Sequence, residues 1–463
     1  MNVALAKPTL QPEDLRERPF TSTRNACKLC APLGASIAFR GISGCIPLIH
    51  GSQGCPTYIR RYVISHFREP IDIASSNFSE ETAIFGGEDN LKKALDNLTR
   101  QYQPEAIGIA STCLSETIGD DVRLYLDRYI KAKQGLALPV LLHASTPSYR
   151  GTHAEGFHEA VRVAVEALAQ GGSQTEEVNL LPGFLSPEDL RHLKDVFDDY
   201  DVPCTLLPDY SETLDGESWE TYQKLSAGGT SLAAIRGMGH ARATLQFGRS
   251  LMGKKTAGTY LEERFQVPLV SLDIPIGIRA TDRFFAFITG CTGRKMPKRY
   301  AAERGRLVDA YIDGHKYLFG KRAILYGEAD FVTSIVSFLD EIGMVPVLCA
   351  TGAAPGKFRQ QVTSVLENTH ELPEVVEDTD FVTMLEMCQK LAPEIIIGNS
   401  KGYSLARKLG IPLVRVGFPI HDRIGGQRLL HVGYRGTQQL FDRLVNTLIE
   451  ASQEASSVGY SYI

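Results

Sequence analysis

Short apolar runs alternate with amphipathic stretches along this chain from about residue 105 onward. Each run has roughly four to six apolar residues and ends at Gly, Ser, Pro or Asp. Such runs between helical stretches are typical of parallel strands that are buried on both faces. They occur in residues 105–112, 139–145, 176–183, 202–209, 267–275, 322–328, 344–352, 393–400 and 411–419. The pattern predicts an α/β fold with doubly wound parallel sheets.

The chain has 463 residues, which is too long for one hydrophobic core, so the strands must be shared among several units. Residues 168–177 are typical of a linker, and residues 318–328 begin a new strand-led unit. We therefore expect α/β domains at residues 1–172, 173–320 and 321–463. Ligands of open parallel sheets bind beyond the carboxyl ends of the strands, so functional side chains are expected in the polar tails STCLSE, STPSY and GNSKGY.

Charge and composition exclude several classes of protein. The net charge is −5 and the Lys and Arg residues are dispersed, which argues against a nucleic-acid binder. No window approaches the roughly eighteen apolar residues of a membrane span. Residues 1–20 also lack the continuous apolar region of a signal peptide. We expect a cytoplasmic protein that binds neither nucleic acid nor membrane.

The nine cysteines are the first candidates for chemistry. An odd number in a reducing compartment argues against a disulfide framework. Cys204, Cys349 and Cys388 lie in apolar strands or helices, where a free thiol is a small buried hydrophobe. Cys45 and Cys291 have no partner motif. Five of the nine cysteines fall in the first quarter of the chain, and this clustering needs an explanation.

Cys30, Cys55 and Cys113 each lie in a turn-like stretch, CAPLGA, HGSQGC and STCLSET. The neighbouring glycines permit close backbone approach, as a bulky sulfur-rich ligand would require. Soft thiolates select iron-sulfur clusters or zinc. Zinc ribbons use two tight CxxC pairs, whereas this chain has only Cys27 with Cys30. Three thiolates are also one short of a closed four-thiolate site, so spacing alone leaves a metal role and simple packing both open.

Several motifs, taken in order, resemble those of the β subunit of nitrogenase component 1. They are CAPLGASIAFRGISGCIPLIHGSQGCPTYIRRY, STCLSETIGDDV, STPSYRGTH, PIGIRATDRF, IIIGNSKGY, PLVRVGFPIHDR and GYRGTQQL. The resemblance covers nearly the whole chain. It implies three Rossmann-like α/β domains and an [8Fe-7S] P-cluster at the interface with an α subunit.

The resemblance also implies roles for single residues. Cys30, Cys55 and Cys113 match the three β-side cysteine ligands of the P-cluster, whose other three thiolates come from the α subunit. Ser148 matches the serine that can add an oxygen ligand when the cluster is oxidised. No catalytic residue is implied in this chain, because the active-site iron-sulfur cofactor belongs to the partner.

Two aromatic residues match positions that take part in electron transfer in the β subunit of nitrogenase component 1. Tyr58 matches an aromatic residue on the path from the P-cluster toward the partner's active site, and Phe85 matches a residue on the docking surface for the electron-donating iron protein. The residues themselves leave simpler roles open. Tyr58 and Phe85 could be packing residues, and Ser148 could cap a helix that starts near Gly151.

Two further features are weaker candidates. The stretch GRSLMGKKT, residues 248–256, nearly makes a P-loop, but a Lys replaces the hydroxyl residue that binds Mg²⁺. We expect the preceding HARATLQF to be helical rather than a strand, so the loop is not placed to cradle phosphate. The resemblance implies that ATP binds to the separate iron protein. His431 lies one residue before the position that matches the cofactor-binding His of the α subunit, where this chain has Val432.

Three functions are compatible with such a chain. The first is the β-type subunit of an α2β2 reductase that relays electrons from an ATP-dependent iron protein to the α-subunit cofactor. The second is a cofactor-assembly scaffold of the nitrogenase N type, and the third is a tetrapyrrole-reductase subunit with a [4Fe-4S] cluster. The complete cysteine trio favours the first. The sequences CKLCAPLGA, VGFPIHDR and GYRGTQQL differ from the corresponding motifs of the molybdenum enzyme. We therefore prefer reductive C–S cleavage of small thioethers (methylthio-alkane reductase) over N2 reduction.

Overall fold

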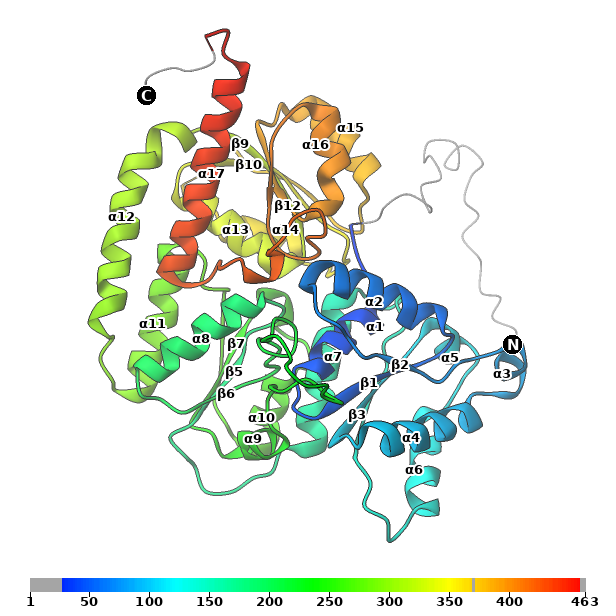
Figure 1. Ribbon diagram of the computed structural model, residues 1–463. Helices are drawn as coiled ribbons and strands as arrows, with labels where there is room; N and C mark the ends of the chain where they lie inside the picture. Colours follow the sequence, from blue (N-terminus) through cyan, green and yellow to red (C-terminus); the bar gives the residue numbers. More distant parts are fainter. Residues whose placement is uncertain (1–26, 369–370, 459–463) are drawn as a thin grey trace, which may run out of the picture.

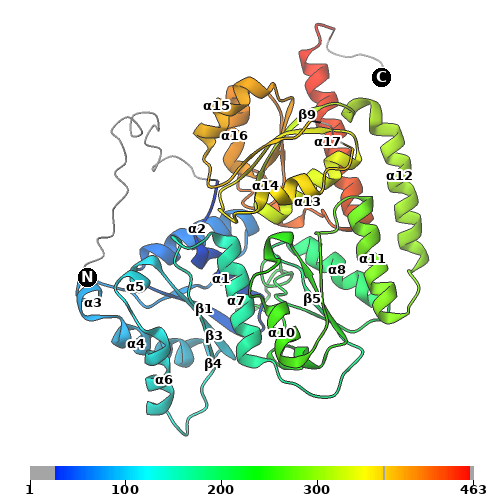
Figure 2. The ribbon, with the colours of Figure 1, turned by 180° about the vertical axis from the view of Figure 1, so that it is seen from behind.

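The structure, a computed structural model, describes residues 27–368 and 371–458. It contains three parallel β-sheets, each flanked by helices (Figures 1 and 2). The predicted α/β fold with doubly wound parallel sheets is therefore confirmed. The segment in which we expected no signal peptide, residues 1–20, lies outside the described residues.

The first sheet has the strand order β2-β1-β3-β4. Its strands are β1 (Cys45–His50), β2 (Ala74–Ser75), β3 (Ala106–Ser111) and β4 (Val140–Ala144). Its helices are α1 (Ala31–Arg40), α2 (Gly54–Phe67), α3 (Glu80–Phe85), α4 (Glu88–Tyr102), α5 (Cys113–Thr117), α6 (Val122–Ala132) and α7 (His153–Leu168). Alternate side chains of β1 are buried on opposite faces: Cys45 and Ile49 join the core with α1 and α7, whereas Ile46 and Leu48 join α4 and α6. Burial on both faces explains why these strands are almost entirely apolar.

The second and third sheets repeat this arrangement. The second sheet, in the order β6-β5-β7-β8, has β5 (Val178–Leu181), β6 (Cys204–Leu206), β7 (Ala243–Phe247) and β8 (Leu269–Leu272), with helices α8 (Pro187–Asp199), α9 (Leu232–Gly237), α10 (Ala257–Phe265), α11 (Ile278–Thr292) and α12 (Lys298–Leu318). The third, in the order β11-β10-β9-β12-β13, has β9 (Arg322–Gly327), β10 (Val345–Thr351), β11 (Glu374–Val376), β12 (Ile395–Gly398) and β13 (Leu413–Arg415), with helices α13 (Ala329–Glu341), α14 (Phe358–Ser364), α15 (Phe381–Leu391), α16 (Tyr403–Leu409) and α17 (Gly433–Ala455).

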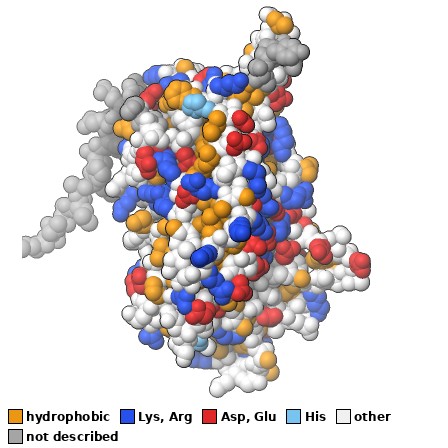
Figure 3. Space-filling view, turned by 90° about the vertical axis from the view of Figure 1, so that its left-hand side faces the viewer, with side chains coloured by type: hydrophobic (Ala, Val, Ile, Leu, Met, Phe, Trp, Pro, Cys, Tyr) orange, Lys and Arg blue, Asp and Glu red, His pale blue; other side chains and the backbone are white. Residues whose placement is uncertain are grey.

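The last helix returns to an earlier part of the chain. Although α17 follows the third sheet, it packs along α12 and against α11 (Figure 1). The face that carries α12 mixes charged side chains of both signs with apolar ones (Figure 3), and Val308, Ile312 and Phe319 are exposed on or next to α12. No helix within the described residues is long and apolar enough to span a bilayer. The domain limits at residues 172 and 320 stay predictions.

One predicted element is wrong. Residues 243–247 form strand β7 in the middle of the second sheet, where we expected a helix. The strand contains Thr244 and Gln246, which interrupt its apolar character, yet both are buried. Asn179 of the neighbouring strand donates a hydrogen bond of 3.1 Å to Thr244 Oγ1, so burial of this hydroxyl is compensated.

Candidate functional site

Three loops leave the same edge of the first sheet. In the parallel register His50 of β1 pairs with Ser111 of β3, and Ala110 of β3 pairs with Ala144 of β4. The chain segments that follow these strand ends carry Cys55, Cys113 and Ser148 respectively. Parallel strands therefore bring together three residues that are far apart in the sequence, at the edge where ligands of such sheets bind.

Cys30 reaches the same edge from the start of α1. It is the N-cap residue of that helix and forms an isolated β-bridge with Thr152, just before α7. Helices α1 and α7 approach closely at two glycines. A Cβ atom at Gly34 would lie 1.7 Å from the His153 carbonyl oxygen, and one at Gly156 would lie 1.9 Å from the Ala31 oxygen. Only glycine allows this approach, and it fixes Cys30 beside the loop that follows β4.

Ser148 connects two of the cysteine segments. Its hydroxyl accepts a 3.2 Å hydrogen bond from the backbone N–H of Ala31, next to Cys30, and its own N–H donates to Cys113 Sγ at 3.2 Å. The alternative in which Ser148 caps a helix near Gly151 is wrong, because Thr152 caps α7. Ser148 therefore ties the start of α1 to the Cys113 loop.

The surroundings of Cys30 shift the pKa of its thiol. Cys30 and Cys113 are exposed and Cys55 is half-buried. Desolvation by the surrounding protein raises the pKa of the Cys30 thiol to about 11. The charges of Cys55 and Cys113 also raise this pKa. Among the residues that the structure describes, no three His, Cys, Asp or Glu side chains are grouped closely enough to hold one metal ion.

The other cysteines of the first quarter lie elsewhere. Cys27 and Cys45 are buried, and burial raises the pKa of each thiol to about 12. Cys27 joins the apolar core of the third sheet, and Cys45 joins that of the first. The CxxC pair of Cys27 and Cys30 is therefore divided between a core and the loop edge, which the motif alone does not reveal.

Two aromatic candidates are surface residues. Tyr58 is 65% exposed on α2, one turn after Cys55, and Phe85 is 81% exposed at the end of α3. Neither is a core residue, so simple packing within this chain does not explain them. Ile84, Leu114 and Tyr149 are also exposed in these segments.

Lys401 is a neighbour of the thiols that the sequence reasoning missed. Its Nζ donates a 3.1 Å hydrogen bond to the Lys28 carbonyl oxygen. Burial lowers the pKa of Lys401, and the charges of Cys27 and Cys30 oppose this effect. The residue belongs to GNSKGY, one of the polar tails expected to be functional. Only the fold shows that this tail of the third sheet reaches the first.

The loop that resembles a P-loop does follow a strand, contrary to our expectation. Three of its backbone donors are nevertheless occupied: the N–H of Ser250 donates to Asp330 Oδ1 at 2.7 Å, and those of Met252 and Lys254 donate to carbonyl oxygens within the loop. A phosphate would face the Asp330 carboxylate instead of free N–H groups. The strand context is thus correct for a P-loop, but the donors are not.

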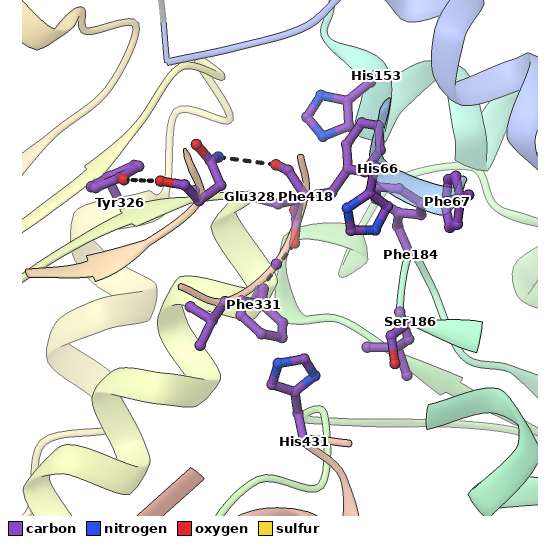
Figure 4. A pocket seen from close by; sticks show the side chains of 15 residues that line it. His66, Phe67, His153, Phe184, Ser186, Tyr326, Glu328, Phe331, Phe418 and His431 are labelled. Atoms are coloured by element: carbon purple, nitrogen blue, oxygen red, sulfur yellow. Dashed lines mark hydrogen bonds between the residues drawn. The ribbon is translucent and has the colours of Figure 1, made fainter. Parts of the chain in front are cut away.

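A cavity of about 30 Å³ lies between the three sheets (Figure 4). Four phenylalanines line it, Phe67, Phe184, Phe331 and Phe418. His431 also faces it; its Nδ1 lies 3.0 Å from Asp189 Oδ2, while its Nε2 has no partner among the described residues. This volume is enough for about two water molecules and far too small for an iron-sulfur cofactor.

Glu328 at this cavity predicts a dependence of stability on pH. Burial, and next the charge of Asp330, raise the pKa of Glu328 from 4.5 to about 8. The folded state therefore holds a proton that the unfolded state releases, and the free energy of unfolding should fall as pH rises from about 4.5 to 8. Glu328→Gln should flatten the decline in melting temperature between about pH 5 and pH 8. Parallel wild-type and variant profiles would contradict this.

Comparisons with known proteins agree on one family. The model for nitrogenase component 1 type oxidoreductases matches residues 30–449. The nitrogenase molybdenum-iron protein beta chain of Clostridium pasteurianum is 35% identical over 95% of this chain and 96% of its own. The nitrogenase iron-molybdenum cofactor biosynthesis protein NifN of Nostoc sp. is 33% identical over 93% of this chain and 94% of its own.

Solved structures give the same result. One chain of "Nitrogenase Cp1 at pH 6.5" superimposes with a TM-score of 0.93 at 34% identity, covering 98% of this chain and 99% of that one. A chain of "Nitrogenase Cp1 at pH 5" matches with a TM-score of 0.70 at 16% identity and covers 95% of this chain and 92% of that one. The second match shows the shared fold alone.

Proposed function

This chain belongs to the nitrogenase component 1 type oxidoreductase family, and on that basis we propose that it is the β-type subunit of a nitrogenase-like reductase complex. One observation carries the proposal: Cys30, Cys55 and Cys113 converge at one exposed edge, and Ser148 bridges two of their segments. These four residues would hold half of an [8Fe-7S] P-cluster. The cluster would supply storage and transfer of single electrons.

The remaining ligands would come from an α subunit in an α2β2 complex. Exposed thiols cannot close a cluster alone, and exposed apolar side chains surround them, including Tyr58, Leu114 and Tyr149. Exposed apolar side chains beside thiols that need further ligands support an interaction surface at this edge. Covering them would exclude water from the cluster and place Tyr58 between it and the partner.

Electrons would enter through an ATP-dependent iron protein that docks over Phe85 and leave toward an iron-sulfur cofactor in the α subunit. The P-loop-like stretch offers no free phosphate cradle, which supports assigning ATP to the iron protein. The small aromatic cavity beside His431 supports placing the active-site cofactor in the partner. We also propose that the complex is cytoplasmic.

For the substrate we propose a small thioether, with N2 as the other candidate. The cleavage would consume two electrons and two protons, break one C–S bond and release a hydrocarbon and a thiol. The motifs CKLCAPLGA, VGFPIHDR and GYRGTQQL, whose sequences differ from those of the molybdenum enzyme, support the thioether. The α chain would bind the substrate, so this chain's residues supply electrons and not substrate contacts.

A cofactor-assembly scaffold is the second candidate, and the similarity to NifN favours it. The two functions differ in turnover. A scaffold would carry cofactor precursors without reducing substrate, whereas a reductase subunit would sustain many turnovers with iron protein and ATP.

Copurification with the α subunit tests the proposal. The complex should contain P-cluster iron and should reduce ethyl methyl sulfide or N2 only when iron protein and MgATP are present. This chain alone should show no reductase activity. Activity of the single chain, or a complex that binds cofactor precursor but never turns over, would refute the reductase.

A further inference from the structure

A buried histidine–aspartate pair lies directly behind the proposed cluster edge. His50 Nε2 lies 3.1 Å from Asp120 Oδ2, and both side chains are almost completely buried, with exposures of 0% and 2%. His50 is the last residue of β1, five positions before Cys55, and Asp120 follows α5, seven positions after Cys113. A buried pair is costly unless further hydrogen bonds complete it. Further hydrogen bonds complete this pair on both sides.

His50 connects to both cysteine loops: its side chain connects through Ser76 to residues 51–55, and its backbone carbonyl connects to residues 112–113. Its Nδ1 lies 3.1 Å from Ser76 Oγ, which accepts the N–H of Gly51 at 3.0 Å. The His50 carbonyl oxygen accepts both the N–H and the hydroxyl of Thr112, at 3.2 and 3.0 Å. With the proton of His50 on Nε2, each donor in the series of hydrogen bonds from Asp120 through His50 and Ser76 to Gly51 has an acceptor.

The Asp120 side of the pair holds the docking segment, residues 79–87. Asp120 Oδ1 accepts the N–H of Gly87 at 3.0 Å and the hydroxyl of Tyr125 at 3.1 Å. The contact is tight: a Cβ atom at Gly87 would lie 2.4 Å from Phe78 Cζ and 2.6 Å from Asp120 Oδ2. Gly87 is two residues after Phe85, so the carboxylate fixes the base of the exposed docking aromatic.

We propose that the His50–Asp120 pair is a positioning device that fixes the docking segment relative to both cysteine loops, and so sets the geometry from which electrons reach the cluster. The inference rests on the proposed function and extends it to two residues that touch neither the iron protein nor the cluster. Its physical basis is rigidity. The hydrogen bonds on the His50 side are buried and those of Asp120 are partly buried, and together they connect the docking segment to the ends of β1 and β3.

Two variants test this role in the α/β complex. Asp120→Asn removes the charge of the pair, and Gly87→Ala pushes against Asp120 and Phe78 without changing any charge. Phe85 stays exposed in both, so the KM for iron protein should change little. The single-turnover electron-transfer rate at saturating iron protein should fall about tenfold or more, because small displacements of reacting groups have large kinetic effects. Iron content should stay at the wild-type level.

Matched controls come from the same chain. Asp189→Asn removes the charge of the other buried His–Asp pair, with His431, whose atoms are 3.0 Å apart at the central cavity. Gly290→Ala adds a methyl group on α11 where no atom lies within 4 Å. Both should transfer electrons at the wild-type rate.

Wild-type rates in both test variants would overturn the inference, and so would an equal loss in Asp189→Asn, which would indicate general destabilisation. Loss of iron in Asp120→Asn with a normal rate in Gly87→Ala would also overturn it, because the pair would then act on cluster assembly. The wild-type complex tests the proposed function separately. If it contains no cluster iron, both the proposed function and the positioning role are refuted.

Discussion

Cys113→Ala should leave the α/β complex with little P-cluster iron and bring substrate reduction down to the background rate. The Cys113 thiol is exposed at the edge where Cys30 and Cys55 converge, and it accepts the N–H of Ser148. A cluster that lacks one thiolate keeps an open iron, which water or oxygen can attack. Iron per complex and turnover with iron protein and MgATP measure the effect.

Cys349→Ala is the control for this experiment. Cys349 is fully buried in β10, and burial alone raises the pKa of its thiol. Its replacement should cost roughly 1 kcal/mol of stability through lost packing and leave iron and turnover intact. Full iron and full turnover in Cys113→Ala would show that this thiol is not a cluster ligand.

Phe85→Asp should weaken docking of the iron protein without disturbing the cluster. Phe85 is 81% exposed at the end of α3, so a charged replacement costs the fold little. An aromatic residue at the centre of an interface typically contributes about 1 to 4 kcal/mol. The KM for iron protein should therefore rise roughly five- to several-hundredfold, with the P-cluster spectrum unchanged.

Phe319→Asp provides the matched control. Phe319 is 67% exposed after α12, on the opposite side of the molecule from α3 (Figure 1). The same chemical change there should leave the KM unaltered. An unchanged KM in Phe85→Asp would place the docking surface elsewhere.

The strands were largely predictable from the sequence because burial on both faces makes each one a continuous apolar run. The segments around β3, β9 and β10 are examples. Strand β7 was missed because Thr244 and Gln246 interrupt its run, and their buried positions depend on Asn179 and the neighbouring strands. The local pattern of apolar and polar residues does not show that a hydrogen bond from a neighbouring strand compensates for burial of a polar side chain.

The site was predictable in part. Glycine-rich turns around the cysteines indicated loops, and the resemblance implied which of them share a cluster. The connections between them were not predictable: Ser148 joins α1 to Cys113, and Lys401 approaches Cys30 from the third sheet. His50 and Asp120 are separated by 70 positions, and only the parallel register places them together.

The central claim is that thiolates from two chains close one cluster at this edge. Anomalous diffraction at the iron absorption edge, on crystals of the α/β complex, tests it most directly. We expect a compact group of iron peaks bonded to Sγ of Cys30, Cys55 and Cys113 on one side and to thiolates of the α subunit on the other. Iron bound by this chain alone, or no iron beside these three sulfur atoms, would contradict the account.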